Sequence, residues 1–411
     1  MRFAIVDGYS TGSALVKVLR QEGAACIHVQ SHRTVPDYFR RGFCPEDYEV
    51  DLGYMADRSR LAAALAGLGV TRVVAGTESG VILADELGAA AGLPGNDPGT
   101  APGRRDKRLT AAAARFAGIP VPAGRAFTDG AEAAAWFTSA RLGEAVVKPP
   151  ASAGTDHVRF CDTADSVRAA CEAILASANL YGDPNEAAIV QERLQGTEYY
   201  LNTVSHGGVH RVAEAWEYTK AVGPGGSPVY DFERPLVMDS PRAAGLRRFV
   251  FAALDALGVE SSAAHTEVIL TGRGPVLVES GARLGGATIP WVVEKYSGVS
   301  QTSLFAAALL DPARLEAFDD LSPRWAGTVR NVAFMNRATG RVRSLGWLDV
   351  VSALPTAVAV ASSVEAGARL EPTVDLIGSP GFVYLAADDP SDVRRDYERL
   401  RALERSNLYT T

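Results

Sequence analysis

The stretch "HTEVILTGRGPVLVESGARLGG", from His265 to Gly286, contains two short apolar segments on either side of the tight turn "TGRG". This pattern predicts a β-hairpin. Glu267 and Glu279 lie at mirror-related positions about the turn, so the hairpin would place them side by side on neighbouring strands. Because like charges opposite each other destabilise a sheet, we expect a positively charged partner to lie near Glu267 and Glu279.

A divalent cation between the two glutamates explains this arrangement. Mg²⁺ binds through a few carboxylates together with substrate phosphate oxygens, and it can bridge the terminal phosphates of a nucleotide. Solvated surface charges are the less favoured alternative, since both glutamates flank apolar segments where an unpaired charge is costly. Arg283, just past the second strand, suits a phosphate or the oxyanion of a tetrahedral intermediate. Gly285 and Gly286 would let the backbone approach that group.

Length and composition limit the class of protein. A chain of 411 residues is expected to form two or three domains. A net charge of -7 argues against nucleic-acid binding, and no segment approaches the roughly 20 apolar residues of a membrane span. The N-terminus "MRFAIVDGYSTG" is a strand entering a glycine loop rather than a signal peptide. We therefore expect a cytoplasmic, multidomain protein.

The pattern of segments changes along the chain. The first hundred residues alternate strand and helix, which predicts a parallel sheet with helices on its faces. The segment "GNDPGTAPGRRDK" marks a boundary. From about Ala187 the pattern is antiparallel, and from about Arg330 a last α/β segment follows. The early loop "VDGYSTGSAL" lacks G-x-G-x-x-G and a later ribose-binding acid, so an NAD-dependent oxidoreductase is disfavoured.

Two further motifs suggest a nucleotide site. In "VVKPPASAGTDHV", Lys148 ends a strand and precedes small residues whose N–H groups can approach an anion, although an ordinary surface hairpin fits equally well. In "AAIVQERLQGTEYYLNT", Glu192 ends a strand and Glu198 follows a turn. The stretch between them could meet an adenine edge, and Glu198 could accept hydrogen bonds from ribose hydroxyls. Taken alone, Glu198 reads as an exposed acid beside a turn.

The order of these motifs resembles the ATP-grasp superfamily over roughly Asn96 to Pro290. The signs are the lysine of "RRDKRLT", the lysine-plus-small-residue loop, "QERLQGTE", the two glutamates and "E-x-x-x-R-x-G-G". The resemblance implies an ATP-grasp fold of α/β and α+β class, with an N-terminal Rossmann-like parallel-sheet domain and a small C-terminal α/β domain. The expected ranges are 1–98 for the Rossmann-like domain, 99–186 for the small lid subdomain, 187–328 for the large subdomain and 329–411 for the C-terminal domain.

The resemblance also implies an activity. Such enzymes use ATP to convert a carboxylate to an acyl phosphate, which an amine then attacks, releasing ADP and phosphate. ATP and one or two Mg²⁺ ions are the implied cofactors, with Mn²⁺ as a substitute. The implied metal ligands are Glu267 and Glu279, and the catalytic group comprises Arg283, Glu279 and Lys148. The implied nucleotide-binding residues are Lys107, Lys148, Ser152, Gly154, Thr155, Glu192, Leu194 and Glu198.

Within the superfamily, "GTESGVILADELGAAAGLPGND", "AHTEV" and "VESGARLGG" look most like the bacterial L-amino acid ligases, the bacilysin-type dipeptide synthases. That resemblance implies amide or dipeptide formation in antibiotic biosynthesis. The expected substrate-binding residues are Glu78, as partner of a substrate amino group, with His265, Arg283, Gly285, Gly286 and Ala287. Gly281 stands where many ATP-grasp enzymes have a third metal ligand, and Ala287 where the bacilysin enzyme has an aromatic residue, which implies a roomier pocket.

Several alternatives stay open. His265 could bind a substrate carboxylate, move a proton or simply pack. The segment "EAWEYTKAVGPGGSPVYDFERPL" could fold over bound substrates and exclude water, or be a surface loop. An ATP-grasp carboxylase or other purine-precursor ligase is the first rival function, and a non-catalytic nucleotide-binding regulatory protein is the second. Small-molecule acid and amine substrates are the expected partners, with a homodimer as the default assembly.

Overall fold

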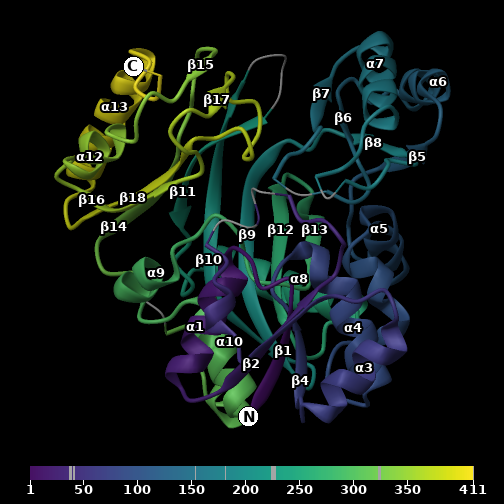
Figure 1. Ribbon diagram of the computed structural model, residues 1–411. Coiled ribbons are helices and arrows are strands. Elements are labelled where there is room, and N and C mark those ends of the chain that lie inside the picture. The colour runs from purple at the N-terminus through teal and green to yellow at the C-terminus, as the bar shows by residue number, and fades with distance from the viewer. Residues whose placement is uncertain are drawn as a thin grey trace. The chain divides into compact units, whose positions relative to one another are not determined.

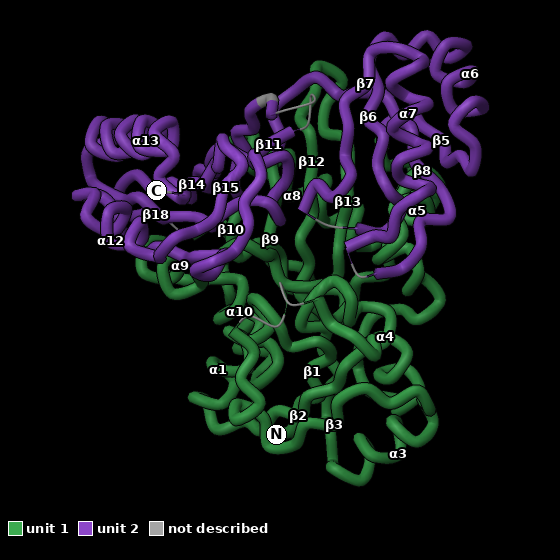
Figure 2. Tube along the Cα trace, turned by 45° about the horizontal axis from the view of Figure 1, so that its top comes forward, with its two compact units in different colours: residues 1–121, 199–215, 237–324 green, residues 122–198, 216–236, 325–411 purple. Residues whose placement is uncertain are grey.

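The computed structural model describes residues 1–36, 39, 42–152, 154–180, 182–223, 228–322 and 325–410. Within these ranges the chain forms two compact units (Figures 1 and 2). Unit 1 comprises residues 1–121, 199–215 and 237–324, and unit 2 comprises residues 122–198, 216–236 and 325–411. The chain passes between the units within two long strands, β9 (Gly196–His206) and β10 (Val209–Val222). The four-part division expected from the sequence stays a prediction.

Unit 1 begins with the predicted parallel sheet. Its order is β3-β2-β1-β4, and its paired strands are parallel. The strands and the helices between them are β1 (Arg2–Val6), α1 (Thr11–Gln21), β2 (Ala25–Gln30), β3 (Val50–Tyr54), α3 (Arg58–Gly67), β4 (Arg72–Ala75) and α4 (Val81–Ala90). The sequence pattern did not indicate β3. β1 and β2 are almost wholly buried, which explains their continuous apolar runs.

The predicted hairpin is also present in unit 1. It consists of β12 (Ala263–Thr271) and β13 (Gly274–Gly281), which pair antiparallel. Glu267 is the register partner of Glu279, as predicted, and a β-bulge follows between this pair and the turn. Within unit 1 the sheet order is β13-β12-β9-β10. The helices that complete the unit are α5 (Lys107–Phe116), α8 (Pro241–Ala256), α9 (Pro290–Ser297), α10 (Gln301–Leu310) and α11 (Pro312–Glu316).

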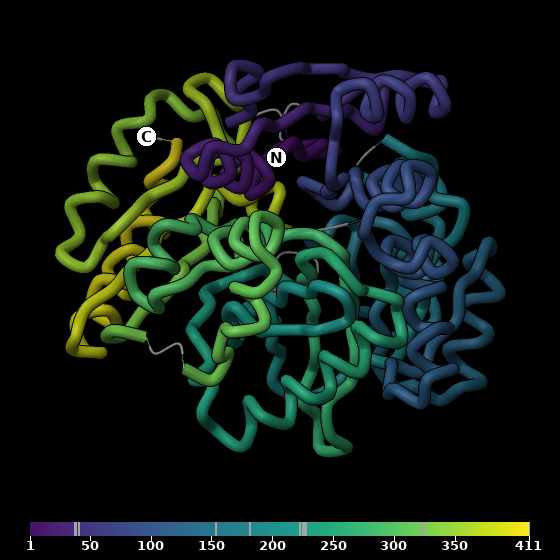
Figure 3. The backbone as a smooth tube through the Cα atoms, turned by 90° about the horizontal axis from the view of Figure 1, so that it is seen from below, coloured from purple at the N-terminus to yellow at the C-terminus, as the bar shows by residue number. Residues whose placement is uncertain are grey.

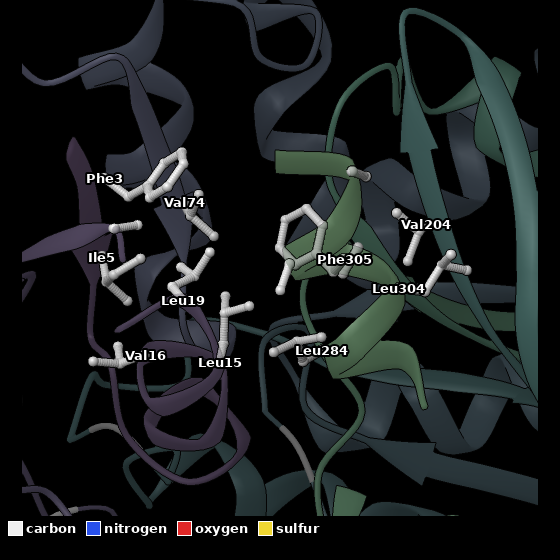
Figure 4. Packing of buried hydrophobic residues seen from close by; sticks show 14 of the residues in the cluster. Phe3, Ile5, Leu15, Val16, Leu19, Val74, Val204, Leu284, Leu304 and Phe305 are labelled. Atoms are coloured by element: carbon white, nitrogen blue, oxygen red, sulfur yellow. The ribbon is translucent and has the colours of Figure 1, made fainter. Parts of the chain in front are cut away.

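One apolar core joins the parallel sheet to the segment after the hairpin. Phe3 and Ile5 of β1, Leu15 of α1 and Phe305 of α10 belong to it, together with Leu284 (Figure 4). Helix α1 lies against α10 (Figures 1 and 3). Because Leu284 is only 2% exposed, the backbone on either side of it, which carries Arg283 and Gly285, is held firmly in place.

Unit 2 contains a small α+β part and an antiparallel sheet. The small part has sheet order β5-β8-β6-β7 and a separate core against its two helices. Its elements are β5 (Gly124–Phe127), α6 (Gly130–Ala140), β6 (Ala145–Lys148), β7 (Arg159–Cys161), α7 (Ala164–Leu175) and β8 (Ala188–Glu192). The first turn of α7 is fixed by a capping box between Thr163 and Ser166.

The antiparallel sheet of unit 2 has order β10-β11-β14-β18-β16. The remaining elements of unit 2 are β11 (Pro228–Pro235), β14 (Thr328–Ala333), β15 (Gly340–Arg341), α12 (Trp347–Ser352), β16 (Ala357–Ser362), β17 (Arg369–Leu370), β18 (Gly381–Ala387) and α13 (Pro390–Arg405), of which β15 and β17 pair in a separate two-stranded sheet. Arg401 fixes α13 by hydrogen bonds to Asp231 of β11 and to Glu404. In the described part of the chain, no helix is long and apolar enough to cross a membrane.

Candidate active site

The two hairpin glutamates each face a cationic or ionisable neighbour in unit 1. Nζ of Lys107 lies 3.0 Å from Oε2 of Glu279, and Nε2 of His265 lies 3.5 Å from Oε1 of Glu267. Lys107 begins helix α5, as predicted, where Asp106 caps the helix by accepting from the backbone N–H of Arg108. The lysine thus reduces the repulsion between the facing carboxylates.

The donor set of this hairpin fits Mg²⁺. No group of three or more His, Cys, Asp or Glu side chains that could hold a metal occurs among the described residues. Two facing carboxylates are an incomplete shell, and Mg²⁺ usually completes such a shell with water and substrate phosphate oxygens. Glu267 and Glu279 would hold the ion, and Lys107 would have to leave Glu279 for it to bind there.

Arg283 is held by Glu78 in a partly buried ion pair. Nε of Arg283 donates to Oε2 of Glu78 at 2.7 Å, and each side chain is 13% exposed. Glu78 lies at the carboxyl end of β4, as predicted, in the short turn Glu78–Gly80. Nη1 of Arg105 lies 3.8 Å from Oε1 of Glu78. Burial alone would raise the pKa of Glu78, but the positive charges of Arg283, Arg105 and Lys107 outweigh it and hold that pKa below its ordinary value.

The glycine pair after Arg283 is anchored from both sides. The N–H of Gly285 donates to Oε1 of Gln301 at 2.8 Å, and its carbonyl accepts from Oγ1 of Thr11 at 2.7 Å. Gly286 follows in an exposed position. Ala287 adopts the left-handed backbone conformation, with φ of 51°, so the chain turns sharply here.

His265 lies in a buried polar network that the sequence did not reveal. Its Nδ1 is 2.8 Å from Oδ1 of Asn202, and Nδ2 of Asn202 donates to Glu214 at 3.2 Å. A Cβ atom on Gly285 would lie 2.9 Å from the amide of Asn202, so this amide also requires the glycine. Nothing in "YYLNTV" distinguishes Asn202 from a strand residue of no special role. The position of Arg105 two residues before Lys107 in "RRDK" was, by contrast, a usable signal.

In unit 2, the predicted phosphate loop joins β6 to β7. Lys148 ends β6 and is only 5% exposed. Oγ of Ser152 donates to Asp156 at 2.6 Å. Gly154 and Thr155 have φ of 67° and 61°, and the carbonyl of Gly154 accepts from the N–H of Leu376 at 3.1 Å. Ala153 lies outside the described residues.

The predicted adenine and ribose residues follow β8. Glu192 ends this strand, and its side chain accepts from the N–H of Ala123 at 3.0 Å. Leu194 is half-buried in the connection to β9. Glu198 accepts from Nζ of Lys220 at 2.7 Å. The segment expected to fold over substrates forms parts of β10 and β11, and its residues 224–227 lie outside the described residues.

Comparisons with known proteins agree on the fold. No family model matches the chain. Dapdiamide A synthase from Enterobacter agglomerans is 28% identical over 414 residues, covering 97% of this chain and 95% of that protein. The crystal structure of L-amino acid ligase from Bacillus licheniformis matches with a TM-score of 0.75 at 18% identity, covering 98% and 97% of the two chains. Carboxyaminoimidazole ribonucleotide synthase from Aspergillus clavatus, complexed with ATP, matches with a TM-score of 0.74 at 14% identity, covering 99% of each chain.

The resemblance inferred from the sequence is therefore confirmed: the chain has the ATP-grasp fold and is similar to ATP-dependent carboxylate–amine ligases. Over nearly its whole length it is similar to a dapdiamide synthase. The predicted roles of individual site residues stay predictions.

Proposed function

We propose that this enzyme joins the carboxylate of an amino acid, or of an acid resembling one, to an amine in an ATP-dependent reaction that releases ADP and phosphate. The observation that carries the proposal is the hairpin β12–β13. It sets Glu267 opposite Glu279, with Lys107 against Glu279 and Arg283 two residues beyond the second strand. Facing carboxylates, a lysine and an arginine form the donor set that phosphoryl transfer to a carboxylate requires.

The reaction divides into two displacements. An oxygen of the substrate carboxylate attacks the γ-phosphorus, the bond to the β–γ bridging oxygen breaks, and ADP leaves. The amine nitrogen then attacks the acyl carbon, phosphate leaves, and the amine loses its proton. Catalysis rests on holding these groups in near-attack geometry. No covalent intermediate with a side chain is needed.

Each predicted residue has a task in this scheme. Lys107 and Lys148, with Ser152, Gly154 and Thr155, would hold the phosphates, and Glu192, Leu194 and Glu198 the adenosine. When bound, Mg²⁺ would neutralise charge on the phosphates between Glu267 and Glu279. Arg283 would stabilise the acyl phosphate and the tetrahedral oxyanion, with the backbone of Gly285 and Gly286 alongside. His265 and Ala287 would face the substrates, and Glu78 lies against Arg283.

The names of two similar proteins, a dapdiamide synthase and an L-amino acid ligase, support small-molecule substrates and a biosynthetic role. We also propose that Mn²⁺ can substitute for Mg²⁺ and that the protein forms a homodimer. A carboxylase acting on a purine precursor is the second candidate, because carboxyaminoimidazole ribonucleotide synthase shares the fold over 99% of its chain. The sequence identity of 28% to the dapdiamide synthase favours the amide ligase.

Phosphate release from Mg-ATP tests the proposal, measured over a panel of amino acids and related acids singly and in pairs, with mass spectrometry of the products. We expect ADP and phosphate only with a productive pair, and a product whose mass is the sum of the pair minus water. Release of AMP and pyrophosphate would contradict the acyl-phosphate scheme. Turnover stimulated by bicarbonate and a purine precursor would favour the carboxylase.

A further inference from the structure

Glu78 is mounted on a rigid turn in unit 1. A Cβ atom on Gly76 would lie 2.5 Å from the carbonyl oxygen of Asp7, and one on Gly80 would lie 2.5 Å from that of Val6. The turn therefore packs directly against the end of β1. Oγ of Ser79 also donates to the carboxylate of Asp7 at 2.5 Å. A side chain on such a tightly packed turn has a well-defined position before any ligand binds.

The carboxylate of Glu78 contacts two guanidinium groups. Its Oε2 accepts from Nε of Arg283 at 2.7 Å, and its Oε1 lies 3.8 Å from Nη1 of Arg105. Nη1 of Arg283 also donates to the carbonyl of Leu284 at 2.8 Å. Two contacts at different nitrogens fix both the position and the plane of the Arg283 guanidinium, and one of them is charge-assisted.

Gly281 provides the space for this ion pair. A Cβ atom at position 281 would lie 2.7 Å from Oε2 of Glu78 and 3.6 Å from Nε of Arg283. The space that a side chain at position 281 would need is thus occupied by the Glu78 carboxylate. Any side chain at 281 would have to displace the carboxylate from Arg283.

The charges around Glu78 do not favour a substrate ammonium. Arg283, Arg105 and Lys107 all lower its pKa, and the carboxylate is already neutralised by the Arg283 contact. An ammonium that entered here would meet three positive charges in a half-buried environment, where repulsion is only weakly screened.

We infer that Glu78 is a positioning residue, which aims the guanidinium of Arg283 at the reacting acyl group, and that Gly281 is required to make room for it. This inference rests on the proposed ligase function and replaces the expected role of Glu78 as partner of the substrate amino group. Arg283 contacts the reacting atoms, whereas Glu78 acts through Arg283.

Glu78→Gln separates the two roles, because a glutamine oxygen can still accept from Nε of Arg283 but carries no charge. For the productive substrate pair, we expect Glu78→Gln to lower kcat about 5-fold without raising the KM of either amino acid, because the arginine loses its charged partner but keeps its acceptor; Glu78→Ala should lower kcat about 100-fold through misplacement of the arginine. Discrimination against a substrate analogue lacking its α-amino group should be the same in Glu78→Gln and the wild type. A rise of 100-fold in the KM of one amino acid in Glu78→Gln would overturn the inference.

Gly281→Ala displaces the carboxylate without removing it, so it should lower kcat as Glu78→Ala does. The matched control is Gly272→Ala in the turn of the same hairpin, where a Cβ atom would meet nothing within 4 Å. Binding of a fluorescent ATP analogue should be unchanged in both glycine variants. Wild-type kcat in Gly281→Ala would overturn the inference.

The steric relation between Gly281 and Glu78 can also be tested without any turnover, by measuring the thermal unfolding midpoint. Gly281→Ala should lower the unfolding midpoint in the wild type and leave it unchanged in a Glu78→Ala background, where the obstructing carboxylate is gone. An equal loss in both backgrounds would disprove the steric relation, even if no substrate pair supported turnover. Failure of the substrate panel alone, with this coupling present, would instead count against the ligase.

Discussion

Each unit places a lysine against a glutamate that the sequence assigns to ATP or its metal, but the two pairs differ in construction. In unit 1, Lys107 and Glu279 are 3.0 Å apart, and their side chains are 14% and 25% exposed. The lysine begins a helix and the glutamate belongs to a hairpin far along the chain. In unit 2, Lys220 and Glu198 are 2.7 Å apart on two long strands, and the lysine also lies over the rings of Tyr218 and Tyr230.

The difference determines what ligand binding must exchange. In unit 1 a cation would replace a cation at Glu279, and the released lysine would gain a phosphate partner, so the exchange is electrostatically balanced. In unit 2 neutral ribose hydroxyls would replace an ion pair that is supported by two aromatic rings, which is less favourable. Both glutamates already have a lysine partner in the unliganded protein, so the affinity of a ligand for either one would be a difference between competing contacts.

The largest expected effect comes from removing the charge at Glu279. Glu279→Gln should lower product formation more than about 100-fold, because a metal-bridged phosphate transfer loses several kcal/mol of stabilisation. Product is measured by mass spectrometry under saturating Mg-ATP. Glu294→Gln, at an exposed position of α9, is the control. Substantial residual turnover in a folded Glu279→Gln protein would contradict the assignment of this residue to the metal.

The second prediction concerns the competition between Lys107 and the metal. Lys107→Met should tighten binding of Mn²⁺ to the nucleotide-free protein by about 10-fold, which corresponds to about 1.4 kcal/mol. The same variant should lose ATP turnover, since the lysine would no longer meet the phosphates. Electron paramagnetic resonance of free Mn²⁺ measures the affinity directly.

Lys295→Met, on the exposed surface of α9, is the matched control for this experiment. Equal or weaker Mn²⁺ binding by Lys107→Met would show that the lysine does not compete with the metal. The exchange of Lys107 for a metal cation at Glu279 would then be contradicted.

The sequence was sufficient for the parts of the site that depend on local pattern. The hairpin and the pairing of Glu267 with Glu279 follow from strand period and turn chemistry. The parallel sheet follows from strand–helix alternation. The short segment "VDLGY" does not indicate β3, because Asp51 and Tyr54 are exposed and none of its residues is fully buried. The helix start at Lys107 follows from its aspartate cap.

The remaining features depend on contacts between distant segments. The Glu78–Arg283 pair joins residues 205 positions apart, and no local pattern encodes it. Asn202 is an ordinary strand residue until folding brings it beneath Gly285. The contact between Lys220 and Glu198 joins residues of two strands, β10 and β9, and the pattern of each strand alone does not indicate it.

The third prediction is a smaller effect in unit 2. Lys220→Met releases Glu198 for the ribose and should tighten nucleotide binding about 3-fold, whereas Glu198→Gln should weaken it by a similar factor. Calorimetric titration with ADP measures both. If Lys220→Met weakened binding instead, the lysine would itself be a nucleotide ligand and the two units would work alike, with each lysine moving from a glutamate to the ligand.

The last prediction compares two partly buried carboxylates, Glu78 and Asp375, whose contributions to the free energy of unfolding should depend on pH with opposite sign. Arg283, Arg105 and Lys107 outweigh the effect of burial and hold the pKa of Glu78 in unit 1 below its ordinary value of 4.5. Its contribution to the free energy of unfolding is therefore present above that ordinary value and is lost as the pH falls through the pKa of the folded state. In unit 2, burial raises the pKa of Asp375 above its ordinary 3.8, with a further contribution from Asp156. This group favours folding most at low pH, and the contribution is lost as the pH rises through the raised pKa.

The two groups should thus act in opposite directions at neutral pH. Glu78→Gln should lower the free energy of unfolding there and lose this effect in acid. Asp375→Asn keeps an oxygen to accept from the N–H of Gly378, as Oδ1 of Asp375 does at 2.6 Å, and should raise the free energy of unfolding at neutral pH. Denaturant unfolding of the three proteins at several pH values from neutral down to about 3, which reaches below the ordinary pKa of a glutamate, measures both. Parallel curves for the wild type and Glu78→Gln would show that the Arg283 contact does not favour the charged carboxylate, and the positioning role would then rest on hydrogen bonding alone.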